Sequence, residues 1–186
     1  METDAALPVG GSSEGTSARV ARAVLFALAG VIFFAHWLIT DPGFDESGAQ
    51  DEWGQVLAFS AVLLSLGVAL PVFGLMVGGR WVIRFSVLAG VGALVAGVAN
   101  IFEDGFQIEG FFFVFILGTA VCDLALLAVA VVIALTECGR RRLLVLVPVA
   151  TVAAIVLYVF AGGPIMLATW LAAAGVALML PAEEPG

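Results

Sequence analysis

Long apolar stretches constrain this chain more than any other feature of its sequence. A bilayer core about 30 Å thick requires roughly 20 consecutive apolar residues in a helix, because lipid offers no hydrogen-bond partner to a bare backbone amide. Six stretches of the 186-residue chain come close to that length. They are Ala18 to Thr40, Gly54 to Gly78, Trp81 to Ile101, Phe111 to Thr136, Leu143 to Phe160 and Pro164 to Leu180. We therefore predict an all-α polytopic membrane protein with six transmembrane helices, which could pair as three helical hairpins.

The composition excludes several other classes of protein. Hydrophobic residues make up 62% of the chain and charged residues 12%, with a mean hydropathy of +1.16, so a soluble enzyme or a disordered regulator is set aside. The net charge of −8 argues against a nucleic-acid partner, and the lipid bilayer is the expected one. All seven basic residues are arginines, so no lysine can form a Schiff base with retinal or pyridoxal phosphate. The sequence leaves the cofactor, if any, unknown.

The arginines predict the orientation in the membrane. With six spans, all seven fall on one side, and the opposite loops carry only acids. The positive-inside rule makes the arginine side cytoplasmic, so we expect a multi-pass protein of the cell membrane with both termini in the cytoplasm. Residues 1–17 are predicted to be a disordered cytoplasmic tail, residues 18–181 the transmembrane domain and residues 182–186 a second tail. The arginines are Arg19, Arg22, Arg80, Arg84, Arg140, Arg141 and Arg142.

Small residues recur at helical spacing and predict how the helices pack. Lipid removes the hydrophobic drive between helices, so helices associate where small side chains let two backbones approach. Most of these residues are expected to pack within the chain, and some could form contacts in a homo-oligomer. The patterns are Gly74 with Gly78; Ala89, Ala93 and Gly97; Gly92, Ala96 and Asn100; Ala168 with Ala172; and Ala173 with Ala177.

The two cysteines are predicted to be free thiols. Cys122 lies in the middle of the fourth stretch and Cys138 beyond its end. Sixteen helical residues separate them by about 24 Å, far more than a disulfide can bridge.

Asp123 is the only acidic side chain inside a predicted span. It lies twelve residues into the fourth stretch, where an ionised carboxylate costs at least about 2.5 to 3.5 kcal/mol on insertion scales. Thr119, one helical turn earlier, is the nearest local partner. Because burial disfavours the charged form, we expect a carboxyl that is mostly protonated at neutral pH. It could relay protons or cations, or grip a polar group of a lipid-like ligand; the alternative is a neutral aspartate that hydrogen-bonds across helices.

A second group of polar residues is predicted to lie at one depth near the outer face, where outward helices end and inward helices begin. His36, the only histidine, belongs to it, and an imidazole beside a carboxylate has the chemistry of an acid–base pair. The same groups could coordinate a divalent cation, but no ligand spacing such as HExxH supports a metal. The alternative is an interfacial belt of aromatic residues and solvated acids. The group consists of His36, Asn100, Glu103, Asp104, Tyr158, Thr169 and Trp170.

Two classes of function fit these features. The first is a non-enzymatic membrane component, either a small transporter or an accessory or assembly subunit with a partner membrane protein. A single acid at mid-membrane depth favours the subunit over an ion-coupled carrier. The alternative is an intramembrane enzyme that acts on a lipid or isoprenoid by carboxyl and histidine acid–base chemistry. Its catalytic residues would be His36, Glu103, Asp104 and Asp123, and its ligand-binding residues Asn100, Thr119, Tyr158, Thr169 and Trp170.

Overall fold

The described part of the chain is an all-α bundle of membrane-spanning character. The computed structural model describes residues 13–39 and 53–179. Six α-helices follow one another, with two π-helical segments (η1 and η3) and one 3-10 segment (η2) between them. In chain order they are α1 (Ser13–Ile39), α2 (Trp53–Val77), α3 (Arg80–Asn100), η1 (Ile101–Gly105), α4 (Phe111–Thr136), η2 (Gly139–Val145), α5 (Leu146–Val156), η3 (Tyr158–Gly162) and α6 (Gly163–Met179).

The predicted number of helices is confirmed, but the fifth is shorter than expected. Five helices are long and apolar enough to cross a bilayer, whereas α5 has only 11 residues. Pro148 lies in the first turn of α5, where a proline removes no hydrogen bond of the helix, and this favours the start of α5 at Leu146. At the other end, the amides of Phe160, Ala161 and Gly162 all donate to the carbonyl of Leu157, so the chain leaves α-helical geometry there.

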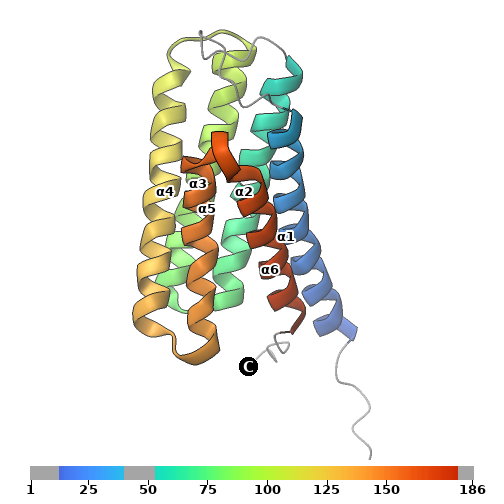
Figure 1. Cartoon of the computed structure of the whole chain (residues 1–186). Helices are drawn as coiled ribbons and strands as arrows, with labels where there is room; N and C mark the ends of the chain where they lie inside the picture. Colours follow the sequence, from blue (N-terminus) through green and yellow to red (C-terminus); the bar gives the residue numbers. More distant parts are fainter. Residues whose placement is uncertain (1–12, 40–52, 180–186) are drawn as a thin grey trace, which may run out of the picture.

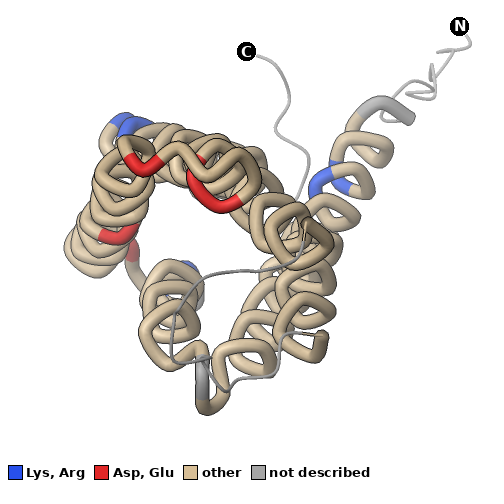
Figure 2. Tube along the Cα trace, turned by 90° about the horizontal axis from the view of Figure 1, so that it is seen from above, with Lys and Arg blue, Asp and Glu red and all other residues tan. Residues whose placement is uncertain are grey.

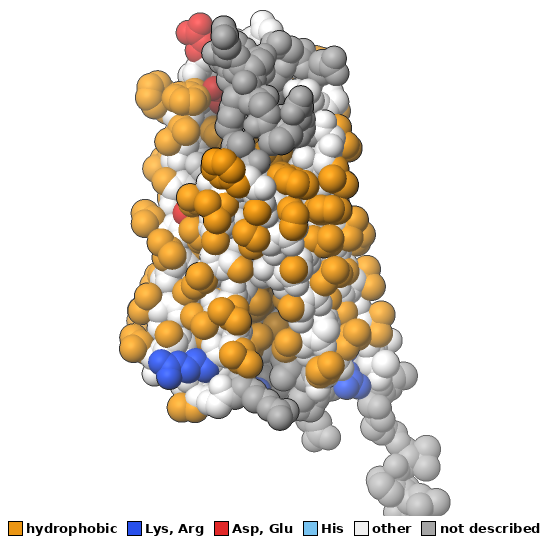
Figure 3. Space-filling view, in the orientation of Figure 1, with side chains coloured by type: hydrophobic (Ala, Val, Ile, Leu, Met, Phe, Trp, Pro, Cys, Tyr) orange, Lys and Arg blue, Asp and Glu red, His pale blue; other side chains and the backbone are white. Residues whose placement is uncertain are grey.

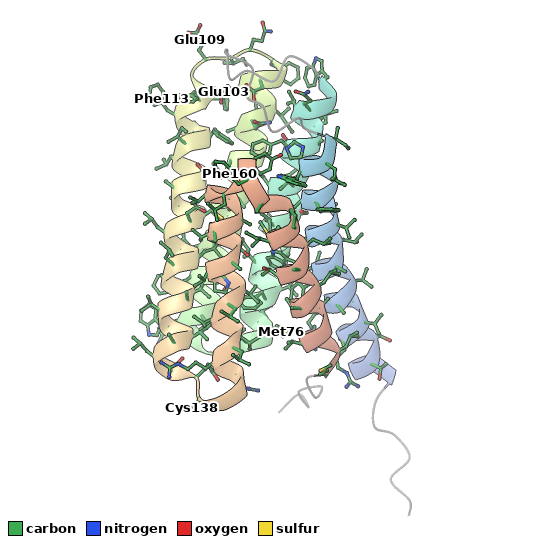
Figure 4. All side chains as sticks on the ribbon, in the orientation of Figure 1. Met76, Glu103, Glu109, Phe113, Cys138 and Phe160 are labelled. Atoms are coloured by element: carbon green, nitrogen blue, oxygen red, sulfur yellow. The ribbon has the colours of Figure 1, made fainter. Side chains whose placement is uncertain are left out.

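The helices form a closed ring in which each packs against the next. The closest pairs are α2 with α3, α3 with α4, and α6 with α1, so the last helix returns to the first (Figures 1 and 2). The start of α1 and the end of α6 lie at the same end of the bundle (Figure 1). We call this the basic end, because blue side chains gather there in Figure 3. The opposite end carries Glu103 and Glu109 (Figure 4), with Asp104 beside Glu103 on η1, and we call it the acidic end. The flank between the two ends is covered by apolar side chains, as expected of a surface that faces lipid.

The bundle is stepped at its acidic end. In Figure 1 the turn between α5 and α6 lies below the tops of α2, α3 and α4. Trp37 of α1 holds this turn in place, since its indole nitrogen donates to the carbonyl of Tyr158 at 2.7 Å. Gly163 lies directly against the same indole, because a Cβ atom added to Gly163 would lie 2.5 Å from the ring. The turn between α5 and α6 is therefore held against the first helix by Trp37.

Three large aromatic side chains fill the centre of the bundle. Phe26 of α1, Phe73 of α2 and Trp170 of α6 are each at most 1% exposed. Their ring centroids lie 5.5 Å apart for Phe26 and Trp170, and 6.5 Å apart for the other two pairs. On the α4 side the interior is completed by Leu126, Val129 and Ile133, all buried. The centre is thus apolar and occupied by side chains.

Two backbones touch where α3 crosses α4. A Cβ atom on Gly92 would lie 2.7 Å from both the Gly118 carbonyl oxygen and the Cys122 nitrogen, and one on Gly118 would lie 2.8 Å from the nitrogen of Ala96. The predicted packing face of Gly92 and Ala96 therefore lies at this helix crossing. Gly78, by contrast, does not pack: its φ of 82° places it in the turn between α2 and α3, with no atom within 4 Å of a Cβ.

The structure bears on the predicted N-terminal tail and on the predicted state of the two cysteines. Residues 13–17, which were assigned to the N-terminal tail, form the first turn of α1. Cys122 and Cys138 are both free, as predicted. The remaining tails and the acidic loop between the first two helices lie outside the described residues.

Candidate functional site

An aromatic layer crosses the bundle near its acidic end. His36, in the last turn of α1, lies between the rings of Phe59 on α2 and Tyr158 on η3, with centroid distances of 5.4 and 5.9 Å. Phe59 in turn contacts Phe115 of α4 at 6.1 Å, and Phe33 contacts Tyr158 at 5.7 Å. We call these five residues the aromatic layer. The aromatic layer joins α1, α2, α4 and η3, so it links these elements across the interior of the ring.

The helical repeat and the π-helical turn together place His36 at the centre of this layer. Phe33 and His36 are three residues apart and so lie on the same face of α1, which is buried. Tyr158 reaches them because η3 turns the chain inward at this depth, below the ends of the taller helices. His36 is 4% exposed, so its imidazole is enclosed by aromatic rings. This environment resembles a packed core position more than an open catalytic centre.

Asn100 connects α3 to α2 just beside the layer. Its side-chain nitrogen donates to the hydroxyl oxygen of Ser60 at 3.1 Å and to the carbonyl of Val56 at 3.4 Å. Both Asn100 and Ser60 are buried, at 2% and 1% exposure. The amide therefore satisfies buried polar groups across a helix interface, which is a structural contribution.

Glu103 and Asp104 lie beyond the layer on the π-helical end of α3. Both are half-buried, and within the described part of the chain neither forms an ion pair with His36. Figure 4 shows Glu103 at the acidic end, on the same side as Glu109. Among the residues that the structure describes, no three histidine, cysteine or acidic side chains come close enough to hold a metal ion. Among the described residues, the predicted ion pair of His36 with Glu103 or Asp104 is therefore not found.

Thr169 and Trp170 do not join the aromatic layer. The Thr169 hydroxyl donates to the carbonyl of Ile165 in its own helix at 2.7 Å. Trp170 is fully buried against Phe26 and Phe73, and its indole nitrogen has no hydrogen-bond partner within the described residues. Of the predicted outer group, the structure thus brings His36 into contact with Tyr158 and places Trp170 in the central core.

Asp123 lies halfway along α4 at the border between the helix interface and the lipid-facing surface. It is half-buried, and no hydrogen bond or ion pair joins its carboxyl to any other described residue. Thr119, the expected partner, donates instead to the carbonyls of Phe115 and Ile116 in its own helix, at 3.1 and 2.9 Å. The carboxyl is left without an intramolecular partner in the described part of the chain.

Sequence reasoning missed three residues of this region. Phe59 and Phe115 bracket the layer, and Trp37 fixes the turn that carries Tyr158. A count of helical turns from the loops would have indicated Phe59 and Phe115, because both lie within two turns of the acidic end of their helices. Nothing local marks Trp37, since its partner is 121 residues away.

Comparison with known proteins does not identify the chain. No family model matches it, and no curated protein and no solved structure is similar to it. The described chain is a helical bundle in which five helices are long and apolar enough to cross a membrane.

Proposed function

We propose that this chain is a non-enzymatic subunit of a membrane-protein assembly, which contributes a preformed helical bundle to a larger complex. The observation that carries the proposal is the interior of the ring. From the aromatic layer to the basic end, its described core consists of apolar and aromatic side chains centred on Phe26, Phe73 and Trp170, apart from the hydroxyls of Ser86 and Thr151.

Polar side chains within the bundle do not form a track for ions. Among the described residues, five buried side chains are polar, and three of them (His36, Ser60 and Asn100) lie at or beside the aromatic layer. Thr151 donates to the carbonyl of Val147 in its own helix, and the Ser86 hydroxyl has no partner in the described part of the chain. A carrier needs polar or charged groups that continue across the membrane. This arrangement favours a subunit over a transporter.

The enzyme alternative is weakened by the same geometry. Acid–base chemistry on a lipid requires a base within reach of a second titratable group and of a substrate. His36 is enclosed by Phe59 and Tyr158, whereas Glu103 and Asp104 lie on η1 without an ion pair to it in the described residues. The packing indicates that His36 stabilises the closure of the ring.

The experiment measures the complex that the full chain forms in its native membrane. Solubilised in digitonin and separated by native electrophoresis, the chain should migrate with a different membrane protein, well above its own 19.2 kDa. A His36→Ala chain that still folds should join the same complex. Migration as a monomer would overturn the proposal. So would ion flux into proteoliposomes, or turnover of a lipid that His36→Ala abolishes.

We also propose that the basic end faces the cytoplasm of the cell that makes the protein, so that both termini are cytoplasmic. The position of the arginines at one end of the bundle supports this orientation. Cys138 is exposed at the basic end and serves as a native reporter. A membrane-impermeant maleimide added to intact cells should leave Cys138 unlabelled. It should label the Glu109→Cys variant made in a Cys138→Ser background, and the reverse pattern would contradict the orientation.

A further inference from the structure

Within the membrane-spanning part of the described chain, Asp123 is an acidic side chain that has neither a hydrogen-bond partner nor an ion-pair partner. It is the thirteenth of the 26 residues of α4, so it lies far from both ends of the helix. No described residue donates a hydrogen bond to its carboxyl or forms an ion pair with it. Acidic residues at this depth almost always find a partner, because lipid cannot solvate them.

The rotation of α4 places Asp123 at the boundary between the buried and the exposed face of this helix. Cys122, the preceding residue, packs on α3, where its backbone would contact a Cβ atom on Gly92. The following residue, Leu124, is 68% exposed and faces lipid. Asp123 therefore lies at the edge of the buried face of α4. The six described helices already form a closed ring, in which each packs against its neighbours.

The chain also lacks a cation that could pair with Asp123. The sequence contains no lysine, and its described arginines lie near the basic end of the bundle. A second copy in the same orientation would bring another carboxyl to this depth and no cation, so it could not form an ion pair there. Charge complementarity therefore selects a different protein as the partner.

We propose that Asp123 is the docking point for a transmembrane helix of a different membrane protein, one that carries a lysine or arginine at mid-membrane depth. This inference rests on the proposed function as an assembly subunit. Ala120, one turn before Asp123, is exposed, and its small side chain lets a second helix approach α4 closely. Leu124 and Leu127, also exposed, supply the apolar contacts on either side. The ion pair would be shielded from water and directional, so it would select the partner.

A synthetic transmembrane helix of about 20 leucine and alanine residues with one central lysine provides the probe. The full chain is labelled at Cys138 with an acceptor dye, reconstituted in phosphatidylcholine vesicles, and titrated with the donor-labelled peptide. The lysine peptide should bind about tenfold more tightly than the same peptide with leucine at its centre. Asp123→Asn should remove that difference, whereas the matched control Asp104→Asn, at the acidic end, should retain it.

If Asp123→Asn disturbs folding, a variant with the opposite charge at position 123 provides a second test of the proposal. Asp123→Lys should lose the lysine peptide and bind a peptide with a central aspartate. Equal binding of the lysine and leucine peptides to the folded wild type would overturn the inference. Energy transfer between differently labelled copies of the chain that depends on Asp123 would also overturn it, because the occupant would then be a second copy.

Different results would contradict the assembly function and the docking site at Asp123. If the native complex of the wild-type chain is absent, the assembly function is wrong. If the complex is present and Asp123→Asn leaves its size and composition unchanged, the chain is a subunit but docks through another surface. Docking at Asp123 is supported only if both the native partner and the lysine peptide are lost in the same variant.

Discussion

Replacing Gly92 with alanine would test the backbone contact that joins α3 to α4. The added Cβ atom would lie 2.7 Å from the carbonyl oxygen of Gly118 and from the nitrogen of Cys122, about 0.7 Å inside the 3.4 Å at which ordinary contact begins. Both contacts are to backbone, which cannot rotate away, so the two helices must separate. Overpacking of this kind costs about 1 to 3 kcal/mol, and the higher helix propensity of alanine returns up to about 1 kcal/mol. We expect a net loss of about 1 to 2 kcal/mol in the free energy of unfolding.

Gly175→Ala is the matched control for this substitution. Gly175 also lies within a helix, but no atom is found within 4 Å of a Cβ placed on it. Its replacement should leave the free energy of unfolding unchanged or raise it by about 0.5 to 1 kcal/mol. The measurement is unfolding by SDS in mixed micelles, followed by tryptophan fluorescence. Gly118→Ala, whose Cβ would lie 2.8 Å from the nitrogen of Ala96, should behave like Gly92→Ala.

The reasoning would be refuted by equal stability of the two alanine variants. If Gly92→Ala unfolds at the same SDS fraction as Gly175→Ala, then α3 and α4 are not in backbone contact at this crossing. An intermediate result for Gly92→Ala, with full loss on Gly92→Leu, would agree with a contact that relaxes by a small helix displacement.

Three further substitutions test other contacts by the same unfolding measurement. The buried Ser86 hydroxyl has no partner in the described part of the chain, so Ser86→Ala should be neutral or stabilising by up to about 1 kcal/mol. Ser60→Ala, which removes a hydrogen-bond acceptor, should cost about 1 kcal/mol, and the opposite order of the two variants would contradict this expectation. Trp37→Phe removes the donor to the Tyr158 carbonyl and should cost about 1 kcal/mol, with faster hydrogen exchange in residues 158–163; unchanged exchange would show that the bond does not hold the turn. Gly79→Ala places a side chain at a φ of 82° and should cost about 1 to 2 kcal/mol, and a neutral result would exclude that backbone geometry.

The extent of the helices could be predicted because it depends on local chemistry. Apolar length fixed five of the six helices to within a few residues, since each must satisfy its own backbone amides in lipid. The fifth was overestimated for a reason that hydrophobicity does not report. Pro148 favours the start of α5 at Leu146, and Gly162 allows the π-helical turn, where a Cβ atom would collide with the carbonyl of Ala154. Hydrophobicity measures transfer into lipid, and it carries little information on backbone geometry.

The sequence predicts how deep the candidate site residues lie in the membrane, but not which residues they contact. His36 and Tyr158 were expected at one level, and they lie 5.9 Å apart. Glu103 was expected beside them, yet it extends along η1 toward the acidic end. Trp170, expected in the same group, contacts Phe26 in the centre of the bundle. Counting residues along a helix gives the depth of a side chain, but the rotation of that helix and the height of the α5–α6 turn decide what it meets.

The sequence by itself determined that this chain is a polytopic helical membrane protein with its basic residues at one end. Those properties follow from the number of consecutive apolar residues and from charges next to them, which do not depend on how the helices pack. Only the tertiary structure decided that His36 is enclosed by aromatic rings and that Asp123 has no partner in the described bundle. Both outcomes depend on which face each helix turns toward its neighbours. That rotation is set by contacts between residues far apart in the chain, such as Gly92 with Gly118 and Trp37 with Gly163.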